Sequence, residues 1–557
     1  MPAVPKDTRL FIAAFLALLS LHLALIATTR LYPFTDLPDH LAAATISRHI
    51  AEPSNQFSRY YTVDSYGKPN TLHLVFCSLK IFPSVEFANR VFLLVYAALV
   101  PLATLSVITK LGGNRWFSLL SFLLVYNYNI SWGFVGFAFA IPLVLAFYYL
   151  FILDTRALES VSGGLFAAAF LVLLFFAHLL AALFCILLLC LRLAVGGAAS
   201  RRAVFGSMLA LVPFVVMISL WWRGETRDHA APGTLAFLSG YYKNVYLETF
   251  AHRRGIFIFD NYHLYEGVRG YAIALAFSSA VIIPSCLFFL KRRLQANSGG
   301  GMQRPADTDA PGDMRQPQRA SGVTPLARAL PLLVGSLLCV LLLPNELPQQ
   351  SVLYERFSVF LLLSIVICGS ALAPPTLPRF VPAVFAALAV FHFALWSDCF
   401  ISFNKENAGF NKSFLAPAGS GEKLAGLVYD YRYRGRPTYI HFPSYYIVWE
   451  KSVAAAMITD YRFGPVRRNV DRRLLPRYLE WVARLGNYDG SYRDMDYLLV
   501  RGTVAERIPS ADAAARPEAA SIGPSAAVNI PAEYLEGFEP MRVSGKWTLY
   551  RKSAPRP

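Results

Sequence analysis

Charged side chains are scarce in this chain of 557 residues: only 16% are Asp, Glu, Lys or Arg, whereas 55% are hydrophobic. A soluble domain carries roughly a quarter charged residues, so the composition excludes an ordinary soluble protein. The apolar residues gather in long runs, the first at 10–29, which reach the roughly 20 residues needed to cross a bilayer core. Segments of about ten residues with alternating polarity are absent, which excludes a transmembrane β-barrel. The sequence therefore predicts a polytopic α-helical membrane protein, because backbone groups in lipid must be hydrogen-bonded within helices.

Motifs for metals and disulfides are also lacking. The seven cysteines form no Cys-x-x-Cys pattern, and no His-Glu-x-x-His pattern is present. Five of them lie in or beside apolar runs, where a free cysteine behaves as a small hydrophobe, and the spacing does not pair Cys77 with Cys399. No cofactor is expected from the sequence. A divalent metal would have only Asp36, Asp39 and His40 as candidate ligands.

The net charge of +17 is not concentrated in one basic cluster. Many of the basic residues lie between apolar runs, where Lys and Arg set the topology from the cytoplasmic side. Nucleic-acid binding would need a patch that neutralises phosphates. This distribution argues against a nucleic acid as a partner and leaves membrane lipids as the surroundings.

Eleven apolar runs are expected to span the membrane. We interpret 161–194 as two short helices that meet near His178, because one long helix would place the basic clusters at 201–202 and 291–293 on the wrong side. The N-terminus is then predicted to be cytoplasmic and the C-terminus extracytoplasmic, in the inner membrane of a bacterium. The expected spans are 10–29, 88–109, 116–130, 134–152, 161–177, 179–194, 203–221, 271–290, 328–343, 354–372 and 381–398.

The chain divides into a transmembrane domain at 1–398 and a small extracytoplasmic α/β domain at 399–557. Two outer loops, 30–87 and 222–270, are expected on the same side as this domain. The segment 294–326 is rich in Gly, Pro and Gln and poor in apolar groups, which predicts a disordered cytoplasmic linker. In the C-terminal domain, 438–443, 496–502 and 546–552 are predicted strands, a helix is expected to begin near Pro476, and 505–530 is a predicted loop.

The most informative polar residues directly follow the first apolar run. Asp36, Asp39 and His40 lie within five residues, and Pro38 suits the first turn of a helix. These residues are candidates for proton-transfer chemistry at the outer membrane surface. The alternative is that Asp36 only caps the helix, with Asp39 and His40 as solvated residues of its first turn.

Basic candidates occur in two other outer segments. Arg356 stands at the outer mouth of a predicted helix, where a guanidinium would suit a phosphate; the alternative is an interfacial arginine paired with Glu355. The loop 222–270 contributes further candidates, with a solvated irregular loop as the alternative. These candidates are Arg253, Arg254, Asp260 and His263.

The stretch 36–40 reads Asp-Leu-Pro-Asp-His and resembles the Asp-Glu-Pro-x-His type motif of bacterial proteins related to the GT-C glycosyltransferases. That superfamily includes protein mannosyltransferases, the aminoarabinose transferase and the catalytic subunits of oligosaccharyltransferases. The Asp, Pro and His positions match, whereas Leu37 replaces the second acid. The segments 70–74 and 86–90 are similar to the entries of the next two helices in this group, and the overall architecture is similar to about residue 400.

The resemblance implies transfer of a sugar from a polyprenyl-phosphate donor to a glycan, lipid or protein acceptor. Asp36, or else Asp39, would be the general base beside His40. The donor phosphate would be bound by Arg356, Arg253 and Arg254, and the substrate loop would contribute Asp260 and His263.

Two other interpretations stay open. A transporter or lipid flippase places ionisable residues within the membrane, whereas the predicted spans here are nearly free of charge and the polar candidates gather on one face. An inactive GT-C-like protein of cell-envelope assembly would have the same sequence features as an active enzyme.

Overall fold

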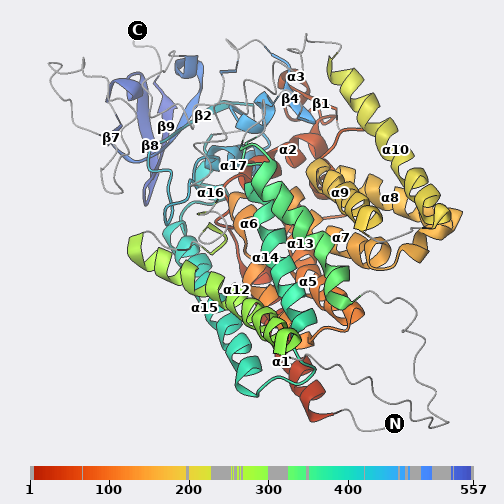
Figure 1. The fold of residues 1–557 in the computed structure, drawn as a ribbon. Coiled ribbons are helices and arrows are strands. Elements are labelled where there is room, and N and C mark those ends of the chain that lie inside the picture. Colours follow the sequence, from red (N-terminus) through yellow and green to blue (C-terminus); the bar gives the residue numbers. More distant parts are fainter. Residues whose placement is uncertain are drawn as a thin grey trace, which may run out of the picture.

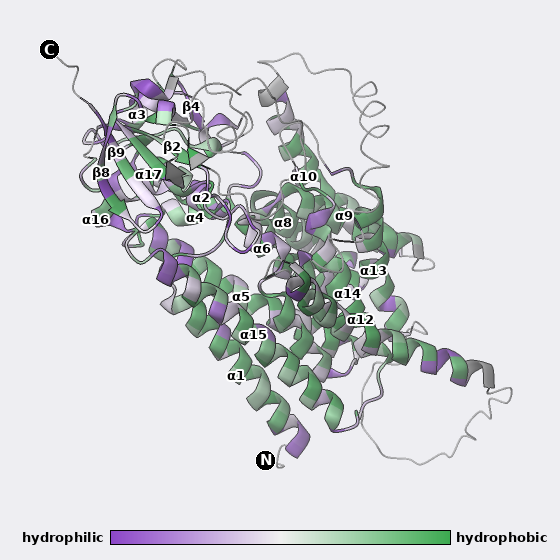
Figure 2. Cartoon of the chain, turned by 90° about the vertical axis from the view of Figure 1, so that its left-hand side faces the viewer, coloured by the Kyte–Doolittle hydropathy of each residue, from purple (hydrophilic) through white to green (hydrophobic). Residues whose placement is uncertain are grey.

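The structure is a computed structural model, and it confirms a chain built mainly of apolar helices (Figures 1 and 2). It describes residues 5–64, 67–195, 200–226, 253, 255, 260–262, 264, 267–298, 324–345, 351–418, 421–461, 464–470, 475–476, 491–504, 529–530 and 532–553. Among these residues, eight helices are long and apolar enough to cross a membrane. They are α1 (Lys6–Thr28), α5 (Val85–Leu111), α7 (Val135–Phe147) with its extension η2 (Tyr148–Ile152), α10 (Arg201–Thr226), α12 (Gly267–Ser298), α13 (Pro325–Leu342), α14 (Ser358–Leu372) preceded by η5 (Glu355–Phe357), and α15 (Phe380–Glu406).

Several predicted boundaries differ from the structure. The run at 116–130 forms a 3-10 helix, η1 (Arg115–Leu124), followed by the short α6 (Tyr128–Trp132). Ten residues at about 2.0 Å each are too short to cross a core of about 30 Å, and residues 116–124 are all buried among the longer helices. The last helix continues to Glu406 instead of ending at 398. Residues 222–226 and 267–270 of the predicted outer loop are helical, as are 294–298 of the predicted linker, while 299–323 lie outside the described residues.

The predicted break near His178 is confirmed. Helix α8 (Val161–Ala177) ends immediately before His178, and α9 (Leu179–Val195) begins immediately after it. Asn70 stabilises the break by two hydrogen bonds. Its side-chain oxygen accepts from the Leu179 backbone amide at 2.8 Å, and its backbone amide donates to the Phe175 carbonyl. A residue of the first loop thus holds two short helices at an angle, which one continuous helix could not provide.

Helix ends meet at two opposite ends of the bundle. At one, which we call the distal end, side chains of Lys110, Arg192 and Arg328 donate to backbone carbonyls of residues 149, 152 and 153. At the other, the domain end, Arg30 after α1 donates to the carbonyls of Asn407 and Phe410 after α15. The basic residues Lys110 and Arg192 therefore lie together at the distal end.

The C-terminal domain contains a five-stranded sheet in the order β3-β2-β5-β9-β8. The strands are β2 (Lys423–Val428), β3 (Val453–Ala454), β5 (Tyr497–Arg501), β8 (Phe538–Ser544) and β9 (Trp547–Lys552). Strand β2 pairs in parallel with β3 and β5, whereas β9 is antiparallel to both β5 and β8.

The strands predicted at 496–502 and 546–552 are confirmed. The strand predicted at 438–443 is wrong: this stretch forms turns and enters the 3-10 helix η6 (Phe442–Ser444), with Pro443 in its first turn. A proline has no N–H to donate to a sheet. Of the helix predicted near Pro476, residues 477–490 lie outside the described residues, as do 505–528 of the predicted loop.

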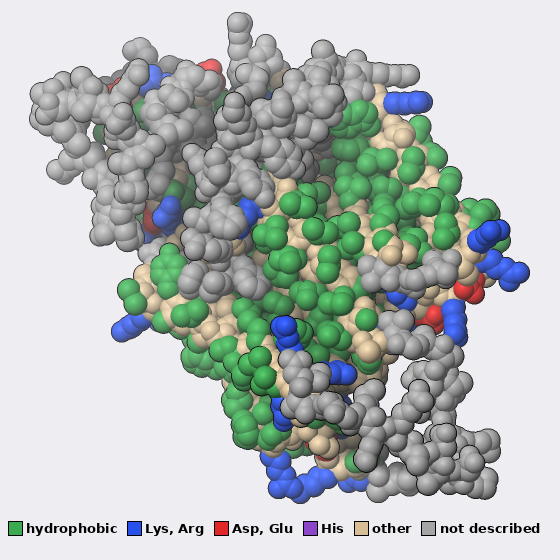
Figure 3. All heavy atoms as spheres, in the orientation of Figure 1, with side chains coloured by type: hydrophobic (Ala, Val, Ile, Leu, Met, Phe, Trp, Pro, Cys, Tyr) green, Lys and Arg blue, Asp and Glu red, His purple; other side chains and the backbone are tan. Residues whose placement is uncertain are grey.

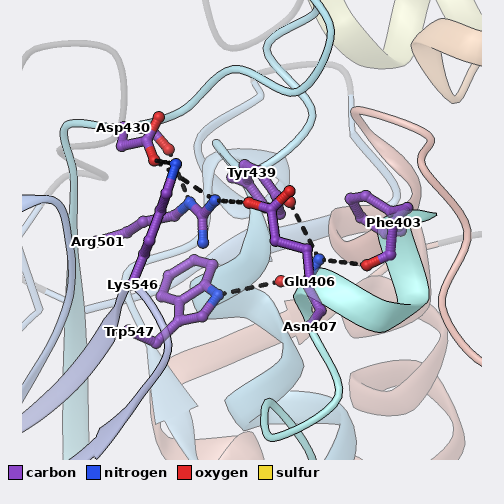
Figure 4. A network of polar contacts seen from close by, with 8 residues as sticks. All are labelled: Phe403, Glu406, Asn407, Asp430, Tyr439, Arg501, Lys546 and Trp547. Carbon is purple, nitrogen blue, oxygen red and sulfur yellow. Dashed lines mark hydrogen bonds and ion pairs between the residues drawn. The ribbon is translucent and has the colours of Figure 1, made fainter. Parts of the chain in front are cut away.

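The domain is packed against both the first outer loop and the last helix. Strand β1 (Tyr61–Val63) in that loop pairs with β4 (Val466–Arg468), and α2 (Leu37–His49) lies against α17 (Tyr445–Glu450) and η6 (Figure 1). A network of polar contacts joins the end of α15 to the sheet (Figure 4). The Arg501 guanidinium lies 2.5 Å from Glu406 Oε1 and 3.6 Å from the ring centre of Tyr439. The Trp547 indole N–H donates a hydrogen bond to the Asn407 side-chain oxygen. The first loop, the last helix and the C-terminal domain are consequently joined by direct contacts at the domain end of the bundle.

Candidate active site

Asp36 is positioned by the end of helix α6. Its amide donates to the Trp132 carbonyl at 2.9 Å, and the neighbouring Thr35 amide donates to the Ser131 carbonyl at 3.3 Å. Gly133, with φ +85°, ends α6, and a Cβ there would lie 2.6 Å from the Asp36 nitrogen. Asp36 occupies the N-cap position of α2, but its side chain makes no capping hydrogen bond and is 21% exposed. The carboxylate therefore has a surface available for a ligand.

The buried imidazole of His441, from the C-terminal domain, lies between the two carboxylates. Its Nε2 is 3.5 Å from Asp36 Oδ1, and its Nδ1 is 3.5 Å from Asp39 Oδ2. Asp39 also accepts hydrogen bonds from the Ser444 hydroxyl at 2.5 Å and from the Ile458 amide at 2.9 Å. The ring thus lies with one nitrogen toward the buried carboxylate and the other toward the partly exposed one.

The alternative of a solvated Asp39 is wrong, because its side chain is 1% exposed. Burial raises the pKa of Asp39, and the opposing effects of His441 and the Ser444 hydrogen bond only partly compensate. Asp39 is therefore enclosed by the C-terminal domain, whereas the Asp36 side chain keeps part of its surface exposed.

His441 and Ser444 were missed by reasoning from sequence. They lie in the stretch 441–444, His-Phe-Pro-Ser, which matches no catalytic or metal motif and overlaps the predicted strand at 438–443. Only the packing of α2 against η6 and α17 brings them to the two carboxylates. No local signal in the sequence could have identified them.

His40 follows Asp39 in α2 and lies beside the buried His73. Burial lowers the pKa of His40, although the charges of Asp36 and Asp39 oppose the shift. Its ring meets the ring of His73 edge-on at 5.9 Å. His73 Nε2 lies 2.9 Å from Asn89 Oδ1 and 3.3 Å from Cys77 Sγ. Because the amide oxygen only accepts, Nε2 carries the proton, so Cys77 and His73 do not form a nucleophile and base. Burial also raises the pKa of Cys77.

His73 should make the protein sensitive to acid. Burial lowers its pKa from 6.5 to about 3, so its contribution to stability is complete above pH 6.5 and is lost as the pH falls toward 3. Each pH unit below 6.5 is expected to cost about 1.4 kcal/mol. His73→Gln keeps an N–H for Asn89 without the titration, and its melting temperature should fall less between pH 7 and pH 5. Thermal unfolding in detergent measures both proteins. If the melting temperature fell equally in both, His73 would not be the group whose titration destabilises the protein.

Arg356 approaches the same region from η5. Its guanidinium lies 3.8 Å from the ring centre of Phe134, and its Nη1 is 3.1 Å from His178 Nε2. Its carbonyl accepts a hydrogen bond from the Asn129 side chain, so α6 holds Arg356 as well as Asp36. The charges of Arg356 and Asp36 attract each other. His178 thus does more than end a helix, since its Nε2 lies next to the Arg356 guanidinium.

Two of the four candidates from the second loop, Arg253 and Asp260, belong to the described residues. Arg253 is buried; it donates to the carbonyls of residues 340 and 343 at the end of α13, and it stacks on Tyr354 at 4.2 Å. Its role as a phosphate ligand stays a prediction. Asp260 interacts electrostatically with Tyr128 and Arg436. Arg254 and His263 lie outside the described residues.

The carboxylates do not fit a shared metal site. Asp36 and Asp39 face different nitrogens of one ring instead of converging on one point. Within the described part of the chain, no group of three or more His, Cys, Asp or Glu side chains is arranged to hold a metal. Comparison of the chain with protein-family models, with curated proteins and with solved structures finds no match.

Proposed function

We propose that the protein is a membrane glycosyltransferase that uses a polyprenyl-phosphate sugar donor at the extracytoplasmic face of the inner membrane. The observation that supports this best is the setting of Asp36. The Asp36 carboxylate is partly exposed and lies at the domain end of an apolar bundle. The buried His441 and Asp39 lie behind it, and the charge of Arg356 attracts it. A base and a cation at the edge of an apolar bundle suit a substrate with a hydrophobic tail and a phosphate.

In the proposed reaction the acceptor hydroxyl gives its proton to Asp36 as its oxygen attacks the anomeric carbon of the donor sugar. The bond between that carbon and the phosphate oxygen breaks, and polyprenyl phosphate leaves with the electron pair. The new glycosidic bond replaces the broken one, so no oxidant or further reactant is needed. His441 faces the Asp36 carboxylate and, held by Asp39, keeps it oriented toward the acceptor.

Arg356 is the proposed ligand of the donor phosphate. A guanidinium is always charged and matches the geometry of phosphate oxygens. The Arg356 side chain is held by contacts with Phe134, His178 and the Val352 carbonyl. Little side-chain entropy would therefore be lost when a phosphate binds. A fixed positive charge also stabilises the charge that develops on the leaving group.

Arg356→Ala should raise the KM for the donor by roughly tenfold or more, because a charge-assisted contact contributes about 1.5–3 kcal/mol. The measurement uses the full chain in proteoliposomes with a radiolabelled polyprenyl-phosphate sugar and a membrane fraction as acceptor source, and follows release of polyprenyl phosphate. Arg59→Ala, in the helix α3 (Phe57–Tyr60) of the same outer loop, serves as the control. An unchanged donor KM would remove Arg356 from the site. No transfer by the unaltered protein from any polyprenyl-phosphate sugar would remove the proposed function.

A further inference from the structure

A second polar site lies between α8 and α10, away from Asp36. The two helices approach closely, since a Cβ on Gly164 would lie 3.0 Å from the Gly206 carbonyl and a Cβ on Gly206 would overlap the Leu158 carbonyl. Small residues allow such close contact between membrane helices. Beside this crossing is a cavity of about 340 Å³, within the size range of small-molecule sites. Its lining residues are Leu158, Glu159, Ser160, Val161, Arg201, Arg202 and Phe205.

The cavity belongs to the part of the molecule that follows the distal end of the bundle. The chain reaches it from Ile152 and Leu153, whose carbonyls accept hydrogen bonds from Arg192 and Arg328. The short helix η3 (Thr155–Glu159) then leads directly into α8. Under the predicted topology this is the cytoplasmic side of the membrane, opposite to the proposed glycosyltransferase site.

Charges of both signs line the cavity. Arg201 and Arg202 are exposed, and within the described residues no ion pair within 4.0 Å joins either of them to Glu159. Glu159 is held instead by the Ser200 hydroxyl, which donates to its Oε1 at 2.8 Å. Ser200 in turn accepts from the Ala203 amide at the start of α10. The two guanidinium groups and the carboxylate are therefore available for a ligand that carries both charges.

The cavity continues into an apolar surface. Val161 and Phe205, which line it, are 60% and 63% exposed, and Leu165 and Met208, one turn further along the same helices, are both 55% exposed. Figure 3 shows basic and acidic side chains gathered where α10 begins, next to this hydrophobic surface. A ligand would thus have its polar part among the charges and its apolar part against the helices.

We propose that this cavity binds the headgroup of a zwitterionic aminophospholipid such as phosphatidylethanolamine. Its phosphate would contact Arg201 and Arg202, its ammonium would donate to Glu159, and its acyl chains would lie along Val161 and Phe205. A purely anionic headgroup would leave Glu159 as a repelling charge. A choline headgroup has no N–H to donate to the carboxylate. The arrangement of charges therefore favours a primary amine.

The test is native mass spectrometry of the full chain in detergent, with synthetic phosphatidylethanolamine, phosphatidylglycerol and phosphatidylcholine of the same acyl chains. We expect phosphatidylethanolamine to bind most tightly. The double variant Arg201→Ala/Arg202→Ala should bind it roughly 10- to 30-fold more weakly, as expected for two arginines near a headgroup. Arg292→Ala/Arg293→Ala removes the same charge from the exposed end of α12 and should bind it normally.

Glu159→Gln separates the lipid classes. This variant should lose the preference for phosphatidylethanolamine over phosphatidylglycerol, because its affinity for phosphatidylethanolamine falls and the loss of a repelling carboxylate raises its affinity for phosphatidylglycerol. Equal binding of all three lipids by the unaltered protein, or equal weakening by both double variants, would overturn the proposal. So would displacement of the lipid by soluble glycerophosphoethanolamine at the same concentration, since the apolar surface would then contribute nothing.

Discussion

Asp36→Asn is expected to reduce sugar transfer by roughly 10²- to 10⁴-fold, the usual contribution of a general base. Asparagine has nearly the same shape but cannot take the acceptor proton. Folding should be unaffected, because the fold uses the Asp36 amide, which donates to Trp132, and no capping bond of its side chain. The measurement is turnover of polyprenyl-phosphate sugar in proteoliposomes, with the melting temperature of each variant in detergent.

Asp64→Asn is the matched control. Asp64 belongs to the same outer loop and is 57% exposed, and its carboxylate lies 3.3 Å from the buried Lys68 and 3.5 Å from Arg467. Asp64 takes no part in the proposed site, so turnover should stay near normal even if the loss of these ion pairs lowers the melting temperature. If Asp36→Asn also transferred sugar normally, Asp36 would not be the base, and a transporter or an inactive assembly protein would become the better interpretation.

Gly133→Ala is expected to lower both stability and turnover, because this glycine touches the backbone of the proposed base. Left-handed backbone costs roughly 1–2 kcal/mol in a residue with a side chain. In addition, the new Cβ would lie 2.6 Å from the Asp36 nitrogen and 2.8 Å from the Leu37 nitrogen. These are backbone atoms, so relief requires Asp36 itself to move, and displacement of a catalytic group by about 1 Å can cost about 10²-fold in rate.

Gly112→Ala isolates the first of these effects, the cost of left-handed backbone. Gly112 ends α5 with φ +72°, close to the +85° of Gly133, but no atom lies within 4 Å of a Cβ built there. It should lose a similar amount of backbone stability and keep its turnover. Thermal unfolding and turnover measured on both variants separate the two effects. Equal turnover in the two variants would show that the α6 end does not position Asp36.

The sequence by itself determined those features that depend on the local pattern of residues. The apolar runs predicted a helical membrane protein, charge asymmetry predicted the break at His178, and 496–502 and 546–552 were recognised as strands. The cluster of Asp36, Asp39 and His40 was also visible. Each of these follows from hydrophobic burial or backbone preference over a few neighbouring residues.

Only the tertiary structure decided which polar groups meet. Ser444 contacts Asp39 across 405 residues of chain, and His441 reaches both carboxylates because η6 and α17 pack against α2. The same packing buries Asp39 and leaves Asp36 partly exposed, which distinguishes two carboxylates that the sequence presents as equals. Contacts of this kind depend on how whole elements pack, and the identity of one histidine or serine carries no signal of its distant partner.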